Sequence, residues 1–475
     1  MIGATKSTAG RNKVNDGRKQ EPNRGVLTDM TKDPREILDK APMSRLQIAI
    51  IVLTSVLNGI DGFDVLSISF ASPGIAAEWS VDRGALGVVL SMELIGMAIG
   101  SIIIGGIADA IGRRRTMLGC LALMAFGMFV TPTSTSIAQL SFWRVLTGLG
   151  LGGLLAAVNA TTAEFSNLRR RHFCVAIMSI GYPVGGVIGG SVASWLLTSY
   201  DWRSVFYLGA TVTTLLIPTL YFLAPESVHW LVRKQPKGAL EKVNKAMIRM
   251  GHAPIDVLPE VAPQVRKKSM GDLFRPGLLG VTVVVTMAYF LHITTYYFIL
   301  KWVPKVVADL GFAVSSAGNV LVCANIGGAI GGTIFGLLSM RFDPKKLTVA
   351  TMALGAVFIA AFGYSPADLV SMGLLAGLCG FFGNTAIVGM FALFAHSFPT
   401  HVRASGTGFA VGVGRGGAIL SPIIVGFLFE WGFALPAVTT LIAIGGLAGA
   451  AVLVFLKIQK QEAPAAAALK KAVSA

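Results

Sequence analysis

The sequence predicts an all-α membrane protein in which twelve transmembrane helices form two halves of six. Of the 475 residues, 53% are hydrophobic and only 13% are charged, a composition that excludes an ordinary soluble domain. Apolar runs of about 20 residues, which is enough to cross a bilayer, recur twelve times along the chain. The 56 glycines are typical of tightly packed membrane helices, because small residues let two backbones approach closely.

The first half follows a polar cytoplasmic tail, residues 1–45. We expect residues 1–30 to be disordered and Asp33 to Lys40 to form a short helix that ends before Pro42. The first six spans are predicted at 46–72, 84–107, 116–133, 138–162, 174–197 and 203–223. Together they predict an N-terminal six-helix bundle over residues 46–223.

The second half is separated from the first by a polar cytoplasmic linker, residues 224–277. Within it, Leu240, Val243, Met247 and Ile248 lie at helical spacing among lysines, which predicts a short amphipathic helix on the cytoplasmic surface. The next six spans are predicted at 278–303, 316–339, 347–364, 367–394, 405–429 and 433–457. They predict a C-terminal bundle over 278–457 and a cytoplasmic tail over 458–475. Two such halves around a central cavity are typical of transporters built from repeats.

The basic residues predict the orientation in the membrane. If the spans alternate in direction, 34 of the 40 lysines and arginines fall on one side, and only Arg83, Arg203, Lys301 and Lys305 fall on the other. Cytoplasmic loops carry such an excess, so both termini are expected in the cytoplasm. The net charge of +16 is then explained by topology, and we expect no nucleic-acid partner.

The four cysteines all fall within apolar spans. They show no metal-ligand spacing, so we expect neither a disulfide framework nor a metal site. No cofactor and no catalytic chemistry are implied by the sequence.

Asp61 and Asp64 lie in the middle of the first span, where ionisable side chains are costly. Each carries a penalty of about 2.5–3.5 kcal/mol at a helix centre on insertion scales. Their spacing places both on one helical face, and Gly59 and Gly62 leave room for a neighbouring helix. The pair is either a polar face satisfied by local partners or, as we favour, an ion or proton site on a transport pathway.

Arg144 in the fourth span and Glu93 in the second are expected at the same depth as Asp64. At 1.5 Å per residue from the outer ends of the spans, all three lie in the outer half of the membrane. A buried guanidinium needs an acidic partner, so we expect Arg144 beside Asp64. Glu93 either competes for Arg144 and adds a protonation step, accepts hydrogen bonds from a substrate, or stays ionised and idle in a water-filled cavity.

The loop between the second and third spans carries the motif GGIADAIGRRR at 105–115. This motif resembles the signature loop of the major facilitator superfamily, which implies the major facilitator fold. Asp109 and Arg113 of the loop are expected to pair at the cytoplasmic gate. In the second half, GLLSMRFDPKK at 336–346 is a degenerate copy in which Met340 replaces the acidic residue, which puts a second charge pair in doubt.

Several further motifs are similar to one branch of this superfamily, the aromatic acid:proton symporters. They are DGFD at 61–64, Arg144 with Glu164 twenty residues later, FPT at 398–400 running to Arg403, GRGGAIL at 414–420, Tyr297 and Asn384. The resemblance covers about residues 42–457. It implies a bacterial inner-membrane importer of benzoate, hydroxybenzoate or a related lignin-derived acid.

The candidate substrate-binding residues lie in the second half. Arg415, near the midplane of the eleventh span, either pairs within its own half or, as we favour, clamps the substrate carboxylate, which Arg binds bidentately. Tyr297 could stack on the substrate ring. Asn384 could bind a ring hydroxyl or bridge two helices. His292 is either a satisfied core histidine, which we favour, or a proton relay.

The sequence therefore predicts a proton-coupled importer of aromatic carboxylates, and not an enzyme. We expect a monomer in the lipid bilayer whose first-span carboxylates take up protons while Arg415 binds the acid anion. The occupied site then favours rocking of the two halves. A salt bridge between Glu164 and Arg403 is expected to close the inner gate.

Two alternatives remain open. The motif GYPVGG at 181–186 in the fifth span is loosely similar to a motif of drug antiporters, which would favour proton-coupled efflux of drug-like molecules or other organic anions. The direction in which hydroxybenzoate moves under an inward proton gradient separates the two. A receptor built on the same fold would be expected to carry a long cytoplasmic domain, and only 18 residues follow Lys457.

Overall fold

The computed structural model describes residues 33–260, 270–399 and 402–456, and these ranges contain helices but no strands. Twelve of the described helices are long and apolar enough to cross a membrane, so the predicted fold class is confirmed. In the first half they are α2 (Arg45–Trp79), α3 (Arg83–Ile111), α4 (Arg113–Val130), α5 (Ile137–Phe165), α6 (Arg171–Leu196) and α7 (Arg203–Leu223). In the second half they are α10 (Leu279–Asp309), α11 (Val314–Leu338), α12 (Pro344–Gly363), α13 (Leu369–Ser397), α14 (Arg403–Glu430) and α15 (Leu435–Val454).

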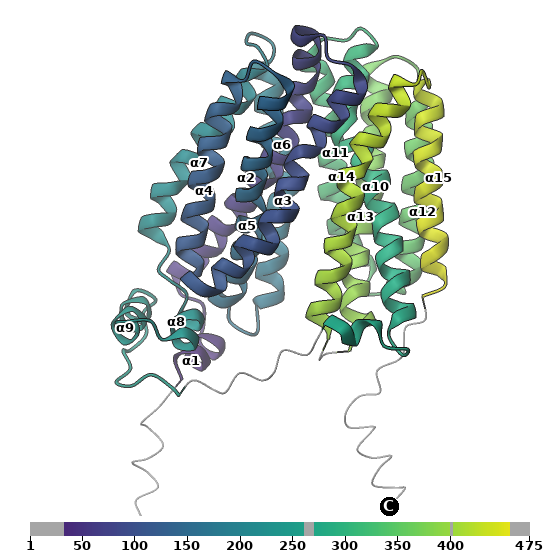
Figure 1. Cartoon of the computed structure of the whole chain (residues 1–475). Helices are drawn as coiled ribbons and strands as arrows, with labels where there is room; N and C mark the ends of the chain where they lie inside the picture. The colour runs from purple at the N-terminus through teal and green to yellow at the C-terminus, as the bar shows by residue number, and fades with distance from the viewer. Residues whose placement is uncertain (1–32, 261–269, 400–401, 457–475) are drawn as a thin grey trace, which may run out of the picture.

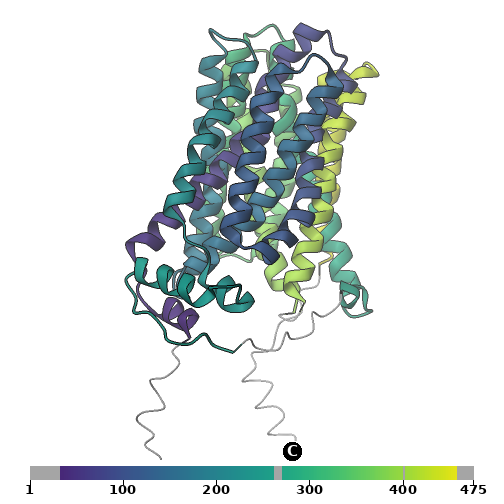
Figure 2. The same ribbon diagram turned by 60° about the vertical axis from the view of Figure 1, so that its left-hand side comes forward.

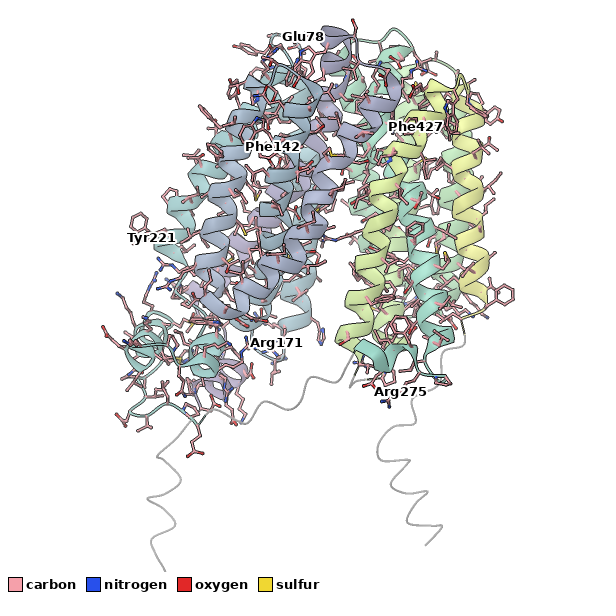
Figure 3. All side chains as sticks on the ribbon, in the orientation of Figure 1. Glu78, Phe142, Arg171, Tyr221, Arg275 and Phe427 are labelled. Carbon is pink, nitrogen blue, oxygen red and sulfur yellow. The ribbon has the colours of Figure 1, made fainter. Side chains whose placement is uncertain are left out.

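The shorter helices gather at one end of the first half (Figure 1). They are α1 (Pro34–Lys40), α8 (Val228–Lys234) and α9 (Ala239–Arg249), and Figure 2 shows them below the bundle in a second view. A short 3-10 helix, η2 (Met270–Phe274), precedes α10. We call this end of the molecule, where the labelled Arg171 and Arg275 lie (Figure 3), the basic end, and the end with Glu78 and Phe427 the opposite end.

The two short helices predicted outside the membrane spans are present. Asp33 caps α1, because its carboxylate accepts a hydrogen bond from the backbone N–H of Arg35 at 2.9 Å. In α9, Val243 and Met247 are buried and Lys242 and Lys245 are exposed, as an amphipathic helix requires. Ile248, which we expected on the apolar face, is exposed. The predicted disorder of residues 1–30 and the C-terminal tail at 458–475 lie outside the described residues.

Helix α2 is longer than predicted, because it continues through Pro73 to Trp79 and does not end at residue 72. A proline inside a helix leaves the carbonyl four residues earlier without its N–H partner. Here the hydroxyl of Ser72 donates to that carbonyl, on Ser69, at 2.9 Å. Such side-chain compensation lets a membrane helix tolerate proline, and α2 ends instead at Ser80, whose backbone is left-handed with φ of 50°.

Glycines bring the helices of the first half into backbone contact. A Cβ added at Gly185 of α6 would collide with the carbonyl oxygen of Gly59 in α2, and one at Gly148 of α5 would collide with the carbonyl oxygen of Glu93 in α3. Because these backbones touch, α2 and α3 are held close to their neighbours. This close packing positions the polar side chains of α2 and α3 against α5.

The two halves are joined from the middle of the bundle to the opposite end. Arg83 pairs with Asp309 at 3.1 Å, the hydroxyl of Ser91 donates to a carbonyl of α14 at 2.7 Å, and Arg415 reaches the carbonyl of Met97 at 3.4 Å. Among the described residues, side-chain hydrogen bonds and ion pairs between the halves do not extend further toward the basic end. The ribbons of the halves accordingly converge at the opposite end and diverge toward the basic end (Figure 1).

Candidate functional site

Arg144 of α5 lies at the centre of a buried cluster of charged side chains. Its guanidinium is inaccessible to solvent, forms an ion pair with Glu93 of α3, and lies 3.5 Å from carboxylate oxygen Oδ1 of Asp64 of α2. It also donates to the backbone carbonyl of Asp64 at 3.1 Å and to the hydroxyl of Ser67 at 3.2 Å. The structure thus brings into contact the three residues that we expected at one depth.

The charges within this cluster do not cancel. Glu93 and Asp64 are both fully buried, and apart from Arg144 their carboxylate oxygens receive no hydrogen bond from the described residues. Two carboxylates that share one guanidinium leave one excess negative charge in a place where burial penalises it. A proton on either acid removes that charge, so this pair can bind and release a proton as a unit.

Asp61 lies one helical turn away from Asp64 and has a different environment. It is buried, and its two carboxylate oxygens have no hydrogen-bond partner among the described residues. The charges that act on it belong to Arg415 of the second half and Glu93 of the first. Asp61 is therefore the acid of the first half whose charge is balanced from the other half.

Arg415 of α14 lies at the interface between the halves. It is half-buried, and its one hydrogen bond among the described residues is the 3.4 Å contact with the carbonyl of Met97. A guanidinium has five N–H donors, so most of these donors remain available. Arg415 can therefore hold an anion at the middle of the bundle, in the place where the sequence predicted a carboxylate clamp.

Two tyrosines lie near Asp61, and one of them, Tyr297, also lies near Arg415. The side chain of Tyr297 in α10 interacts with the hydroxyl of Tyr182 in α6, and the charges of Arg415 and Asp61 act on Tyr297. Tyr297 was predicted as a site residue, whereas Tyr182 was missed. The available signal was its position within GYPVGG, which we interpreted only for its glycines and proline.

His292 and Asn384 make helix-bridging contacts within the second half. The Nε2 of His292 donates to the carbonyl of Gly383 at 2.9 Å, and its ring is nearly parallel to that of Tyr296, with 6.3 Å between the ring centroids. The side-chain amide of Asn384 donates to the carbonyl of Gly328 at 2.8 Å. For each residue this is one of the two alternatives that the sequence left open.

The signature loop at the basic end forms a charge network within the first half. Arg113 pairs with Asp109 at 2.7 Å and with Glu164 at 3.2 Å. Asp109 also forms an ion pair with Arg233 of α8 at 3.0 Å. The network therefore ties α3, α4, α5 and the start of the linker together.

The expected pair between Glu164 and Arg403 is not formed in this conformation. Glu164 pairs with Arg113 instead, and Arg403 donates to the carbonyl of Phe398 in its own half at 3.3 Å. The physical reason is the divergence of the halves, which carries the two residues apart. Thr400, which belongs to the same motif, lies outside the described residues.

The second half has no equivalent of this network among its described residues. Met340, at the place of the acidic residue, is 81% exposed. Asp343, the nearby acid, is engaged at the N-terminus of α12, where it accepts the N–H of Lys345 at 2.7 Å. The degenerate motif had put a second charge pair in doubt, and the described residues of the second half form none at this place.

Glu226 is a member of the basic-end network whose role we missed. Its carboxylate oxygen Oε1 accepts the backbone N–H groups of Arg113 at 2.8 Å, Arg114 at 3.2 Å and Ser227 at 3.0 Å. It thereby caps α4, whose own N-cap residue, Gly112, has no side chain. Burial raises the pKa of Glu226, because the charged form is less well solvated there.

Lys301 requires a correction. The sequence counted it among the charges of the outer side, at the end of a span predicted over residues 278–303. Instead α10 continues to Asp309, and Lys301 is fully buried within the bundle. The signal was available as the apolar sequence that surrounds this lysine on both sides.

The chain was compared with known protein families and curated proteins. A model described as Major Facilitator Superfamily matches residues 54–305 and 285–474. The gallate transporter of Pseudomonas putida is 28% identical over 427 residues, which cover 89% of this chain and 94% of that protein. The 4-hydroxybenzoate transporter PcaK of Acinetobacter baylyi is 29% identical over 436 residues, which cover 90% and 94%. Both names fit the aromatic-acid branch that the motifs predicted.

Solved structures show the same fold. The D-xylose-proton symporter matches with a TM-score of 0.67 and 17% identity, over 87% of this chain and 99% of that chain. The partially occluded inward open conformation of the xylose transporter XylE from E. coli matches with a TM-score of 0.68 and 16% identity, over 88% and 100%. The described chain is thus a multi-pass membrane transporter and not an enzyme, and it belongs to the Major Facilitator Superfamily.

Proposed function

We propose that the protein imports an aromatic carboxylate together with protons, as a monomer in a bacterial inner membrane. The observation that carries this proposal is the buried set of three carboxylates, Asp61, Asp64 and Glu93, in one half, with Arg415 of the other half acting on Asp61. Acids in a membrane interior mark ion and proton pathways, and a free guanidinium binds a carboxylate bidentately. The aromatic-acid names of the relatives support the choice of substrate class.

The basic end is placed in the cytoplasm, since cytoplasmic loops carry the excess of lysine and arginine. The conformation described above is then inward-facing, with the halves closed at the periplasmic side and apart at the cytoplasmic side. In the outward-facing state the cytoplasmic ends approach each other. Glu164 and Arg403 are the charged pair that we assign to that closure.

The binding steps follow from the charges. A proton on the Asp64–Glu93 pair removes its excess negative charge. The acid anion binds Arg415, and Tyr297, which interacts with Arg415, Asp61 and Tyr182, lines the site around the ring. Because the anion and Asp61 compete for Arg415, substrate binding favours a neutral Asp61, and protons and substrate therefore bind together.

The alternative of efflux has less support. The motif that suggested it supplies Gly181 and Gly185, and an added Cβ at these positions would collide with the carbonyl oxygens of Ser55 and Gly59 in α2. Close packing of α6 on α2 accounts for both glycines. The motif then gives no separate argument for the direction of transport.

Purified protein in proteoliposomes tests the proposal. Under an inward proton gradient, labelled benzoate, 4-hydroxybenzoate or gallate should accumulate inside, and the outer medium should become more alkaline. A protonophore should abolish both effects, and cyclohexane carboxylate, a non-aromatic acid of similar size, should compete only weakly. Clearance of a preloaded aromatic acid under the same gradient would contradict import and favour the antiporter.

A further inference from the structure

Lys301 is a residue of the second half whose charged group reaches into the first. It lies in α10 and is fully buried, and its Nζ donates to the backbone carbonyl of Val65 in α2. The next residue, Trp302, donates from its indole N–H to the carbonyl of Pro422 in α14 at 3.1 Å. The backbone around Lys301 is thus fixed to the second half, while its ammonium is held by the first.

The charges that act on Lys301 all belong to the first half. They are Glu93 of α3, Asp64 of α2 and Arg144 of α5. On its own helix, Lys305 lies one turn further and is paired with Asp309. Of the other helices of the second half, α11, α12, α13 and α15 carry no carboxylate, and α14 carries only Glu430 at its last residue. The acids available to Lys301 are therefore Asp64 and Glu93, which together with Arg144 we call the proton cluster.

The charges of the two halves balance across the interface. Three buried carboxylates and Arg144 give the first half an excess of two negative charges. Lys301 and Arg415 give the second half two positive charges. A buried ammonium without a nearby carboxylate is costly, so this balance favours contact between the halves at the level of Lys301, on the side of the opposite end.

We propose that Lys301 is a positioning residue that couples closure of the opposite end to release of the proton. When the opposite end closes, the ammonium arrives beside Asp64 and Glu93 and favours their charged form. When it opens, the ammonium leaves and the acids retain a proton more readily. By linkage, protonation of the acids must in turn weaken closure of the opposite end.

This inference deepens the proposed function, because release of a proton in the inward-facing state is what an importer requires. The contact between Lys301 and the cluster does not itself depend on the identity of the substrate. The test can therefore be made without any substrate.

Two spin labels at the opposite end report closure. Tyr200, between α6 and α7, and Ala313, between α10 and α11, are both exposed and belong to different halves. In the otherwise wild-type protein at neutral pH we expect a short distance between the labels, and a longer population that grows as the pH falls. In Lys301→Met the longer population should already appear at neutral pH. Its midpoint should move to higher pH by about one to three units, the usual effect of removing a nearby opposite charge.

Three further variants separate charge balance from general damage. Lys301→Arg keeps the cation and should stay near the wild-type midpoint. Lys301→Met with Glu93→Gln removes one charge of each sign and should restore the short distance. Lys346→Met removes an exposed lysine of the same half at the start of α12 and should behave like wild type.

A wild-type distance and midpoint in Lys301→Met overturn the proposal, as does an equal shift in Lys346→Met. If Lys301→Met does not reach the membrane, its recovery by Glu93→Gln supports the charge balance, and failure to recover contradicts it. If the wild-type protein accumulates no aromatic acid but the label distances shift as described, the import function fails and the role of Lys301 stands. The reverse result leaves import intact and removes Lys301 from the coupling.

Discussion

At the scale of single residues, the three buried acids of the first half differ in what neutralises them. Asp64 and Glu93 share Arg144 within one rigid half. Asp61 has no hydrogen-bond donor among the described residues and depends on Arg415 across the interface. Since Arg415 is also the proposed ligand of the substrate carboxylate, Asp61 is the acid that we propose couples the substrate to the proton.

Asp61→Asn should abolish proton-driven accumulation, because the amide cannot take up a proton. Exchange of labelled for unlabelled acid needs no net proton movement and should persist, with substrate binding as tight as in the wild type or tighter. Uptake assays in proteoliposomes measure the accumulation, and counterflow assays measure the exchange. Asp82→Asn is the matched control, since Asp82 is an exposed cap of α3 and asparagine caps equally well. Normal accumulation by Asp61→Asn would exclude Asp61 from coupling.

Arg415→Lys should weaken substrate binding about tenfold or more. A lysine offers a point charge in place of the planar fork, and a hydrogen bond to a charged group contributes about 1.5–3 kcal/mol. Equilibrium binding of labelled 4-hydroxybenzoate and the KM of uptake should change together. Arg275→Lys, at an exposed ion pair with Asp272, should leave both unchanged. Unaltered binding by Arg415→Lys would place the carboxylate clamp elsewhere.

At the scale of the helices, backbone contacts decide which side chains meet. Gly59 in α2 and Gly185 in α6 let the two helices touch. Asn58, next to Gly59, then donates its amide to the carbonyl of Met178 in α6 at 2.8 Å. With α2 held in this way, the face that carries Asp64 is directed toward α5 and Arg144.

Gly185→Ala should destabilise the protein by about 1–3 kcal/mol, the usual cost of overpacking. The new methyl group would collide with the backbone carbonyl of Gly59, which cannot rotate away as a side chain can. A lower thermal unfolding temperature in detergent is the expected result. Gly119→Ala in α4 is the control, because no atom lies within 4 Å of the added carbon. Equal stability of the two variants would contradict this account of α2–α6 packing.

Glu226 gives a pH-dependent prediction at the start of α4. Burial raises its pKa in the folded protein, so the wild type loses stability as the pH rises through the range between the unfolded and folded values. Glu226→Gln keeps an acceptor for the three N–H groups without the charge. It should be at least as stable as wild type at neutral pH, with the difference in stability vanishing in acid.

Glu226→Ala should lose about 1 kcal/mol of stability, the usual value of a helix cap. Thermal unfolding across pH measures all three, and a Gln variant as unstable as the Ala variant would argue against capping.

At the scale of the whole molecule, the charges are divided unequally between the halves. The first half holds the proton cluster and the basic-end network. The second half supplies Arg415 and Lys301, and in its described spanning helices its carboxylates, Asp309 and Glu430, lie at helix ends. We therefore expect rocking of the halves to move two cations relative to three acids and to make the state of the gates sensitive to protons.

Gly87→Trp should shift the molecule toward the state that is closed at the basic end. An added Cβ at Gly87 would already collide with the carbonyl oxygen of Pro422 in α14, so an indole prevents closure of the opposite end. Labels at the exposed residues Leu168 and Met340, on opposite halves of the basic end, should then lie closer together. Gly119→Trp should leave their distance unchanged. An unchanged distance in Gly87→Trp would show that the halves do not rock about a fixed middle.

Depth along the membrane was predictable for the acid and arginine cluster, but lateral partners were not. The rise of 1.5 Å per residue placed Asp64, Glu93 and Arg144 at one level, and the structure brings them into contact. The apolar runs ended the first predicted span at residue 72 and the seventh at residue 303. Both helices continue, because a hydroxyl replaces the lost proline donor in one and buried contacts accommodate Lys301 in the other.

The sequence by itself determined the number of spans, the family and the shared level of Asp64, Glu93 and Arg144, because apolar length, motif and helical rise are local properties. The tertiary structure decided which charges meet. Helix rotation and backbone contact determine that Glu93 pairs with Arg144 and that Glu226 caps α4. The conformation of the halves determines that Glu164 pairs with Arg113 and not with Arg403. The surroundings of Lys301 were also decided by the tertiary structure. The acids that act on it, Asp64 and Glu93, lie on helices more than 150 residues away in the chain, and no local sequence pattern indicates such a pairing.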